Sequence, residues 1–427
     1  MNVLSAVPAG GASNQQQEGS GQSMADQEVI VIGGVDTHKG CHVAAVLDHN
    51  GGVLGSQSFP ATASGYQSLL DWMRGHGRLL KVGVEGTGSY GAGLTAHFRS
   101  NEIEVLEVNR PNRQMRRRRG KNDTVDAIAA ARAALSGQAT AVPKSNDGPI
   151  GSLKAIRVAF VSLRETRTKL INQMHAIVVC APAELRSELQ KLNAEQLIAR
   201  CSRFRRGELS EPLHGAKTAL RALGRQCEAL DEEVEELRSA INELTAKANP
   251  ALLSAKGVGP DVASILLIVA GDNPERLRSE AAFAALCGVS PIEASSGKNV
   301  RHRLNRGGDR RANHAFWRIV MVRLSCDERT KAYVAKRTAE GKSIKEIMRC
   351  LKRHIAREVF RLLTKPVAVP LGAELRESRK AAKLSLQTVA DQLNTWPIRV
   401  SEIERGVAYD SDFATRYQDW LRSESVA

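Results

Sequence analysis

The fold is decided by the stretch Val29-Ile30-Val31-Ile32-Gly33-Gly34-Val35-Asp36-Thr37-His38-Lys39, which opens with four β-branched residues. Such an apolar run predicts a buried strand over Val29–Ile32. A second run, Cys41–Leu47, predicts another strand, and Val53–Phe59 predicts a third. Between the last two lies Asp48-His49-Asn50-Gly51-Gly52, a sequence typical of a hairpin turn. We therefore expect the three strands to form an antiparallel meander.

The following residues predict alternating helices and strands. In chain order they are helix Ser64–Arg74, strand Leu80–Val84, helix Tyr90–Arg99, strand Ile103–Val108 and helix Asp123–Leu135. Ser64 is the expected N-cap of the first helix. Three strands followed by helix, strand, helix, strand and helix is the order of RNase H-like folds. Right-handed crossovers would then complete a mixed five-stranded sheet. We assign an α/β RNase H-like domain to residues 29–140.

Four acidic residues stand where this fold would bring them together. Asp36 follows the first strand and Glu85 follows the fourth, and these two strands would be neighbours. Asp123 and Asp126 lie three residues apart, on one face of the last helix. Converging carboxylates repel one another unless cations neutralise them, and Mg²⁺ prefers oxygen ligands. The four acids therefore predict a metal centre for Mg²⁺ or Mn²⁺, although each alone could be a solvated cap or loop residue.

A basic run lies directly before the last two acids. It holds seven cations and no acid: Arg110, Arg113, Arg116, Arg117, Arg118, Arg119 and Lys121. A charge run is often only solvated. Beside the carboxylates, we expect it to hold a nucleic-acid backbone, with strongly salt-dependent binding.

Residues 151–250 predict long helices. An alternating three- and four-residue spacing of apolar positions runs from Leu220 to Leu244, as in coiled coils. A similar pattern from Leu153 to Ile177 is interrupted by Arg167. Periodicity does not identify the partner helix, so a helical hairpin within one chain and a seam between two chains are both open.

Residues 251–365 predict a mostly helical domain with a helix-hairpin-helix around Gly257-Val258-Gly259. Its polar loop contains Ser295-Ser296-Gly297-Lys298 and is rich in cations. The cations expected to contact nucleic acid are Lys298, Arg301, Arg303, Arg306, Arg310 and Arg311. From the residues alone, the loop is either a flexible turn on a basic binding face or the location of a nucleophilic serine.

Composition limits the function classes. The 427 residues carry a net charge of +15, which favours a polyanionic partner. No apolar run is long enough to span a membrane, so we expect no membrane association. The seven cysteines are scattered and form no C-x-x-C pair, as in reduced cytoplasmic proteins.

Both ends of the chain differ in composition from its centre. Residues 1–28 are rich in Gly, Ser, Ala and Gln, which predicts a disordered tail, and Met24 is a candidate start. Residues 371–427 predict a small helical domain similar to phage-repressor helix-turn-helix domains, with the helix from Ile398 to Arg405 in the DNA-reading position. This segment has more acids than bases, so a protein-binding role is an equal alternative.

Residues 29–365 resemble the IS-one-ten family of insertion-sequence transposases, which includes the pilin-gene invertases. The resemblance is carried by five motifs: Gly34-Val35-Asp36-Thr37-His38-Lys39, Val84-Glu85-Gly86-Thr87-Gly88-Ser89-Tyr90, Lys121-Asn122-Asp123-Thr124-Val125-Asp126-Ala127, Gly257-Val258-Gly259, and Ala285-Leu286-Cys287-Gly288-Val289-Ser290-Pro291 with Ser295-Ser296-Gly297-Lys298. It implies a RuvC-like domain with a Mg²⁺ site at Asp36, Glu85, Asp123 and Asp126, joined by a coiled coil to a domain with a nucleophilic serine. That serine would be Ser296, with Ser295 as the second choice.

The same resemblance implies a reaction and partners. Serine attack on a DNA phosphodiester would give a covalent phosphoserine link and a free 3′-hydroxyl. Donor and target DNA would be bound by a homodimer or homotetramer, and a structured non-coding RNA would guide the choice of site.

Two other functions fit the same residues. A RuvC-like junction-resolving nuclease would need only the carboxylates and would form no covalent intermediate. A non-catalytic DNA-binding regulator with a decayed enzyme domain is the third reading, against which the complete set of four acids speaks.

Overall fold

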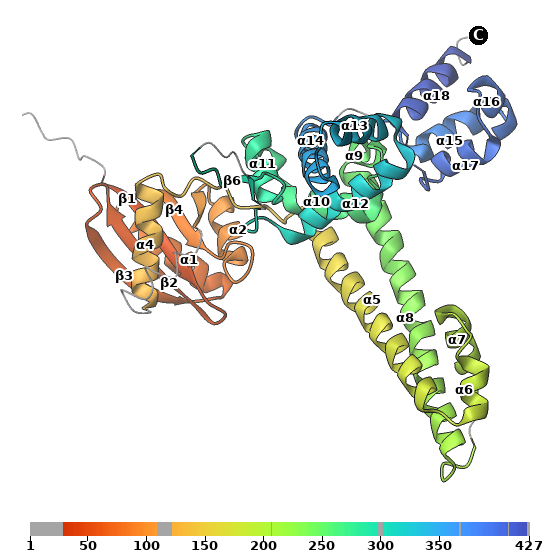
Figure 1. The fold of residues 1–427 in the computed structure, drawn as a ribbon. Coiled ribbons are helices and arrows are strands. Elements are labelled where there is room, and N and C mark those ends of the chain that lie inside the picture. The colour runs from red at the N-terminus through yellow and green to blue at the C-terminus, as the bar shows by residue number, and fades with distance from the viewer. Residues whose placement is uncertain are drawn as a thin grey trace, which may run out of the picture. The chain divides into compact units, whose positions relative to one another are not determined.

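The structure is a computed structural model that describes residues 29–108, 122–205, 207–297, 302–303, 305–366, 369–408 and 410–424. The chain divides into two compact units between Pro143 and Lys144. Each unit is described by itself, and its elements are labelled in Figure 1.

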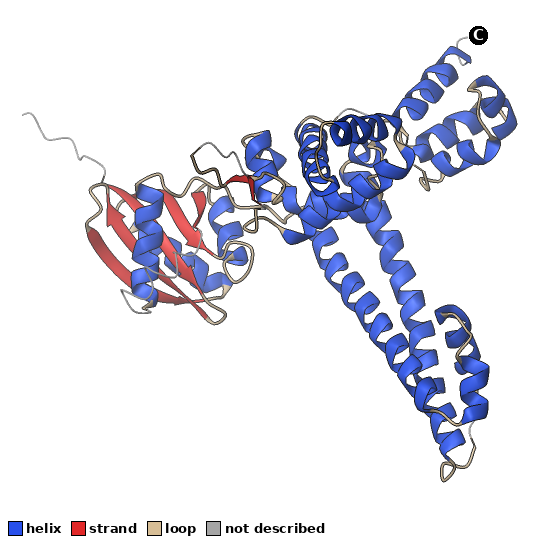
Figure 2. Cartoon of the chain, viewed as in Figure 1, coloured by secondary structure: helices blue, strands red, loops and turns tan. Residues whose placement is uncertain are grey.

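The first unit contains one mixed sheet of five strands, in the order β3-β2-β1-β4-β5. The strands are β1 (Ile30–Thr37), β2 (Cys41–Asp48), β3 (Val53–Pro60), β4 (Arg78–Glu85) and β5 (Glu104–Val108). The first three strands pair antiparallel, whereas β4 is parallel to both β1 and β5. The sequence prediction of a hairpin meander followed by two crossovers is confirmed. A mixed α/β unit followed by helical regions is likewise observed (Figure 2).

Helices cover both faces of this sheet. They are α1 (Ala63–Arg74), α2 (Ala92–Ser100) and α4 (Asp123–Leu135). Alternation along β1 sends Val31 and Val35 into one core with α1 and α2, while Ile32 packs with the C-terminal part of α4. Figure 1 shows α4 lying across the face opposite α1. The unit therefore has three layers: α1 and α2 on one face, the sheet in the middle, and α4 on the other face.

Two local predictions were wrong in detail. The first strand does not end at Ile32 but continues to Thr37, so that Asp36 lies within it. The cause is that Gly33 and Gly34 do not interrupt the ladder, which pairs with both β2 and β4 along this stretch. The N-cap of α1 is Thr62 instead of Ser64, because the Thr62 hydroxyl accepts a hydrogen bond from the Gly65 amide at 3.2 Å.

The second unit begins with two long helices that pack against each other along their length (Figure 1). These are α5 (Pro149–Cys180) and α8 (Pro212–Ala248), and the chain between them forms α6 (Ala183–Leu189) and α7 (Ala194–Cys201). The apolar seam of α8 is covered by α5 and α7 of the same chain, as the hairpin interpretation expects. Arg167, which interrupts the pattern of α5, donates to Asp231 of α8 with two nitrogens.

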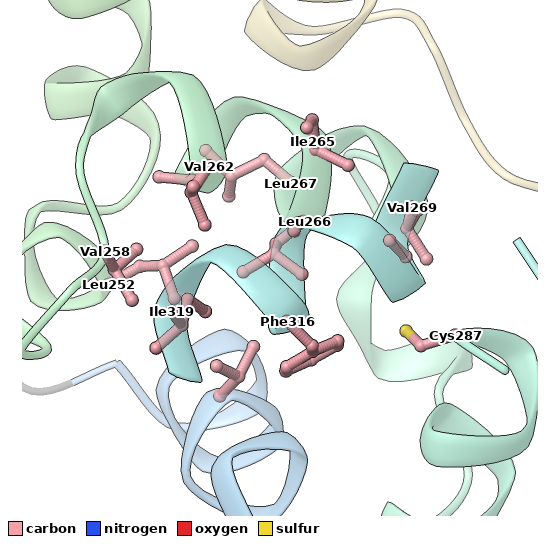
Figure 3. Close-up of a cluster of buried hydrophobic side chains, with 14 of the residues drawn as sticks. Leu252, Val258, Val262, Ile265, Leu266, Leu267, Val269, Cys287, Phe316 and Ile319 are labelled. Carbon is pink, nitrogen blue, oxygen red and sulfur yellow. The ribbon is translucent and has the colours of Figure 1, made fainter. Parts of the chain in front are cut away.

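A compact helical core follows. Its elements are α9 (Pro250–Ser254), α10 (Pro260–Ala270), the 3₁₀ turn Pro274–Arg276, α11 (Glu280–Leu286), β6 (Ile292–Glu293), β7 (His302–Arg303), α12 (Arg310–Cys326), α13 (Glu328–Ala339) and α14 (Ile344–Thr364). Helix α10 is apolar nearly all round, so it is buried at the centre. Figure 3 shows its residues Val262 and Leu266 in the same cluster as Phe316 and Ile319 of α12. The turn between α9 and α10 uses Gly257 with φ +81°.

The last four helices have a core of their own. They are α15 (Gly372–Ala381), α16 (Leu386–Gln392), α17 (Pro397–Glu404) and α18 (Ser411–Glu424). At its centre the buried Glu404 carboxylate accepts hydrogen bonds from Arg379 at 2.6 and 2.8 Å and from the Tyr417 hydroxyl at 2.8 Å. Across the described parts of the chain, no helix combines the length and the apolar character that a membrane span requires.

Candidate functional site

The carboxylate cluster, defined as Asp36, Glu85, Asp123 and Asp126, is built on close contact between α4 and the sheet. A Cβ atom at Gly34 would lie 2.2 Å from the Ala131 amide nitrogen and 2.3 Å from the Ala127 carbonyl oxygen. At Gly83 it would lie 2.4 Å from the Ala130 carbonyl oxygen. Glycine at both positions therefore lets the alanine face of α4 rest directly on β1 and β4. This contact sets the position of Asp123 and Asp126 in the first turn of α4.

Two carboxylates come from neighbouring parallel strands. Val35 pairs with Val84, so that Asp36 and Glu85 follow in adjacent positions of β1 and β4. The Thr37 hydroxyl donates a hydrogen bond of 2.8 Å to the Glu85 carbonyl oxygen and ties the two strand ends together. Asp36 is 7% exposed and Glu85 is 8% exposed. Both acids are therefore held in a largely desolvated position.

His38 lies between two of the acids. Its Nε2 atom is 3.2 Å from Asp36 Oδ2 and 3.4 Å from Asp123 Oδ2. This nitrogen is buried and has a hydrogen bond with neither oxygen, because the angles are unsuitable. Candidate ligand atoms of Asp36, His38 and Asp123 all lie within 4.8 Å of one another, a spacing suited to a shared metal ion.

The cluster is electrostatically strained in the absence of a cation. Burial raises the pKa of the Asp36 carboxyl, His38 opposes the rise, and Glu85, Asp126 and Asp123 add to it. Glu85, Asp123 and Asp126 are thus all close enough to act on the Asp36 carboxyl. Oxygen-rich, mutually repelling ligands with an unbonded imidazole nitrogen fit a divalent cation. The structure is compatible with a divalent metal without identifying which one.

His38 is the residue of this region that the sequence prediction missed. The signal was available, because Asp36 and His38 are two residues apart in extended chain and so share one side. The basic run predicted beside the cluster, Arg110–Lys121, lies outside the described residues.

The second candidate region is a β-hairpin in the helical unit. Ile292 pairs with Arg303 and Glu293 with His302, so that β6 and β7 form an antiparallel ladder. We call residues 292–303 the serine hairpin. Ser295 and Ser296 lie exposed in its connecting segment, and Gly297 beside them has φ +55°. The sequence predicted a polar loop here, and the hairpin is an addition to that prediction.

Cations surround the base of the serine hairpin. Arg303, Arg306, Arg310 and Arg311 are exposed, whereas Lys298 and Arg301 lie outside the described residues. Asp309, the acid between these arginines, caps α12 by accepting hydrogen bonds from the amides of Arg311 and Ala312 at 2.8 and 2.9 Å. The cap engages this carboxylate locally and leaves the surface strongly basic.

Comparison with known proteins places both regions in one class. A family model for the DEDD domain of IS110 transposases, described as "Transposase", matches residues 33–180. A second model, described as "Transposase IS116/IS110/IS902 family", matches residues 249–335. The first match contains all four acids of the carboxylate cluster, and the second contains the serine hairpin. Both candidate regions therefore lie within segments that match models of transposases.

A curated relative agrees with this class. The chain is 27% identical over 154 residues to the "Insertion element IS110 uncharacterized 43.6 kDa protein" of Streptomyces coelicolor, a stretch that covers 34% of this chain and 38% of the relative. The match thus spans well under half of the relative's length. The two family models and this relative show that parts of the chain are similar to IS110-type insertion-sequence transposases.

Proposed function

We propose that the protein is a DNA transposase and site-specific recombinase that cuts DNA and rejoins it through a covalent serine intermediate. The observation that carries the proposal is the convergence of Asp36, His38 and Asp123, with Glu85 and Asp126 close enough to act on Asp36, within a segment that matches a transposase model. The strand order of the sheet supports an RNase H-like, RuvC-like domain. The exposed serine on a basic hairpin supplies the second reacting region.

The carboxylate cluster would hold Mg²⁺ or Mn²⁺: Asp36, Glu85, Asp123 and Asp126. His38 lies beside two of these acids, Asp36 and Asp123. A bound divalent cation supplies Lewis-acid stabilisation of phosphodiester oxygens. The chain's own contribution is geometric. The strand ends hold Asp36 and Glu85, and the glycine contact of α4 brings Asp123 and Asp126 onto them.

The proposed reaction begins at Ser296. Its Oγ atom attacks the phosphorus of a DNA phosphodiester, the Oγ–P bond forms, and the bond from phosphorus to the 3′-oxygen breaks. The serine loses its proton, and the departing 3′-oxygen gains one. Four exposed arginines would neutralise phosphate charge around this serine: Arg303, Arg306, Arg310 and Arg311. Ser295 is the alternative nucleophile.

Partners follow from this chemistry. Donor and target DNA are the expected substrates, and a structured non-coding RNA is the expected guide. A homodimer or homotetramer would let several active sites act on the four DNA ends of an exchange. The basic hairpin supports a nucleic-acid partner, and the matches to transposase models support DNA.

A strand-exchange assay tests the proposal, with a plasmid that carries the element and its flanking DNA. We expect Asp36→Asn and Ser296→Ala to bind DNA and to lose exchange by about a thousandfold or more, because each removes a group acting in the chemical step. Ser295→Ala is the matched control and should stay active. If Ser296→Ala is active and Ser295→Ala is not, the nucleophile is Ser295. Exchange by a variant that lacks both serines contradicts the serine mechanism, and cleavage by that variant that still needs Asp36 supports the junction-resolving nuclease.

A further inference from the structure

A small cavity at the base of the serine hairpin is lined by three cations. They are Arg303 of β7, and Arg349 and Lys352 of α14, with Ser290 and Asn305 beside them. We call these five residues the Lys352 pocket. No carboxylate lines the pocket among the residues that the structure describes. A cavity whose charged lining residues are all cations is suited to an anion.

Lys352 is the most informative of the three. It is 9% exposed, although lysine is almost never fully buried without a charged partner. Its Nζ atom donates to the Asn313 side-chain oxygen at 2.9 Å, and the Asn313 amide donates to the Gly288 carbonyl oxygen at 2.7 Å. Burial lowers the pKa of the Lys352 amine, and Arg349 lowers it further. One neutral amide offsets little of the cost of burying an ammonium group.

Nearby acids are engaged elsewhere. Glu280 pairs with Arg353 and Arg357, the next cations along α14. Glu346 closes a capping box, in which it accepts from the Ser343 amide at 3.0 Å and from the Ser343 hydroxyl at 2.7 Å. Within the described chain, none of Arg303, Arg349 and Lys352 forms an ion pair. These three charges therefore share a cavity and no protein counter-charge.

We propose that Arg303, Arg349 and Lys352 together bind one backbone phosphate of the nucleic-acid partner at the mouth of this cavity, whose volume of about 20 Å³ has room for little more than one water molecule. The inference rests on the proposed function and adds a positioning site to it. Guanidinium groups match phosphate oxygens bidentately, and a buried ammonium supplies a concentrated charge. Arg303 also pairs with Ile292 in the ladder of the serine hairpin. A phosphate held here would fix the hairpin base and the path of the strand that leads to Ser296.

The test uses the full-length protein and a fluorescent DNA duplex of arbitrary sequence, bound over a series of NaCl concentrations. Lys352→Met, Arg349→Gln and Arg303→Gln should each weaken binding about 3- to 10-fold near 0.1 M salt and lower the salt-dependence slope by up to about one. Because the three cations share one phosphate, the triple variant should also lose about one. Lys247→Gln, on the ion-paired surface of α8, is the matched control and should change neither quantity.

Inorganic phosphate is the second probe, without DNA. Phosphate should raise the melting temperature of the wild-type protein above that in chloride of equal ionic strength, and Lys352→Met should lose this gain. Arg349→Gln alters an exposed side chain and keeps the test valid if Lys352→Met folds poorly. The single-phosphate site is overturned if the salt-dependence slopes of the variants are unchanged, or if the slope of the triple variant falls by about three. Neither result affects the transposase proposal. The opposite outcome is also distinguishable. If the wild-type protein binds no DNA, but phosphate stabilises it and this effect is lost in Lys352→Met, the anion site is upheld and the proposed function is refuted.

Discussion

At the scale of single residues, the site depends on which charges the fold forces together. Asp36 and Glu85 are buried at the ends of adjacent strands, and Asp123 is brought to the same His38 nitrogen as Asp36. Such a set is costly unless a cation is shared. The position of His38 suits a direct ligand of the proposed metal ion or a group that orients two ligands.

His38→Ala tests that position. We expect Mn²⁺ binding, followed by electron paramagnetic resonance, to weaken about 10- to 100-fold, because ligand-orienting groups carry that much metal affinity. His49→Ala, in the exposed turn between β2 and β3, is the control and should bind Mn²⁺ like the wild type. Equal affinity of the His38 variant would show that the imidazole takes no part in the metal centre.

The four acids could be predicted from sequence because strand ends and helical spacing place them without side-chain detail. The roles of Lys352 and Asn313 could not. Each lies on an ordinary amphipathic helix, and their significance arises only when α12 and α14 pack beside the Gly288 turn. A buried lysine has no sequence signature, because its spacing is that of any core residue.

At the scale of elements, α4 links the sheet to the carboxylate cluster. Its alanine face, with Ala127 and Ala131, fits Gly34 with no room for a side chain. A displacement of α4 therefore moves Asp123 and Asp126 together. The sequence predicts this helix with the bounds that the structure has. It does not predict that α4 packs directly on glycines of β1 and β4.

Gly34→Ala tests this coupling. The added Cβ would collide with backbone atoms, so we expect the free energy of unfolding of this unit to fall by about 1–3 kcal/mol and the melting temperature to fall by several degrees. Mn²⁺ affinity should fall with it. Gly40→Ala is the control, because nothing lies within 4 Å of its added Cβ. A Gly34 variant that keeps both its melting temperature and its Mn²⁺ affinity would contradict the role given to α4.

Other elements show where periodicity stops being informative. The repeat in α8 predicts a packed seam, yet its partner α5 is more than thirty residues earlier, and only the fold reveals it. Arg167 breaks the pattern of α5 because its partner is Asp231, a charge on the opposite helix. The strands β6 and β7 have two residues each, too short for any alternation to be detected.

At the scale of the whole molecule, the chain contains separate hydrophobic cores. Residues of α15, α16, α17 and α18 form one cluster, and the helices from α9 to α14 contribute to another. The core formed by α15 to α18 surrounds a buried charge pair, Arg379 with Glu404. We expect each core to respond to its own mutations.

Glu404→Gln tests this independence. It leaves Arg379 buried without a counter-charge, and such a loss costs about 3 kcal/mol or more. Hydrogen exchange should accelerate across residues 372–424 and stay unchanged across residues 30–135. Glu377→Gln, at an exposed position of α15, is the control. Faster exchange in both regions would show that the cores unfold together.

We propose that two chemically different regions, the carboxylate cluster and the serine hairpin, serve one DNA-joining reaction. The most direct measurement is mass spectrometry of the protein after reaction with DNA that carries the element ends, in the presence of Mg²⁺. The account predicts a nucleotide attached to the peptide that contains Ser296, absent in Ser296→Ala and lost in Asp36→Asn. DNA cut without any protein-bound nucleotide, or a nucleotide attached to a residue outside the serine hairpin, would contradict it.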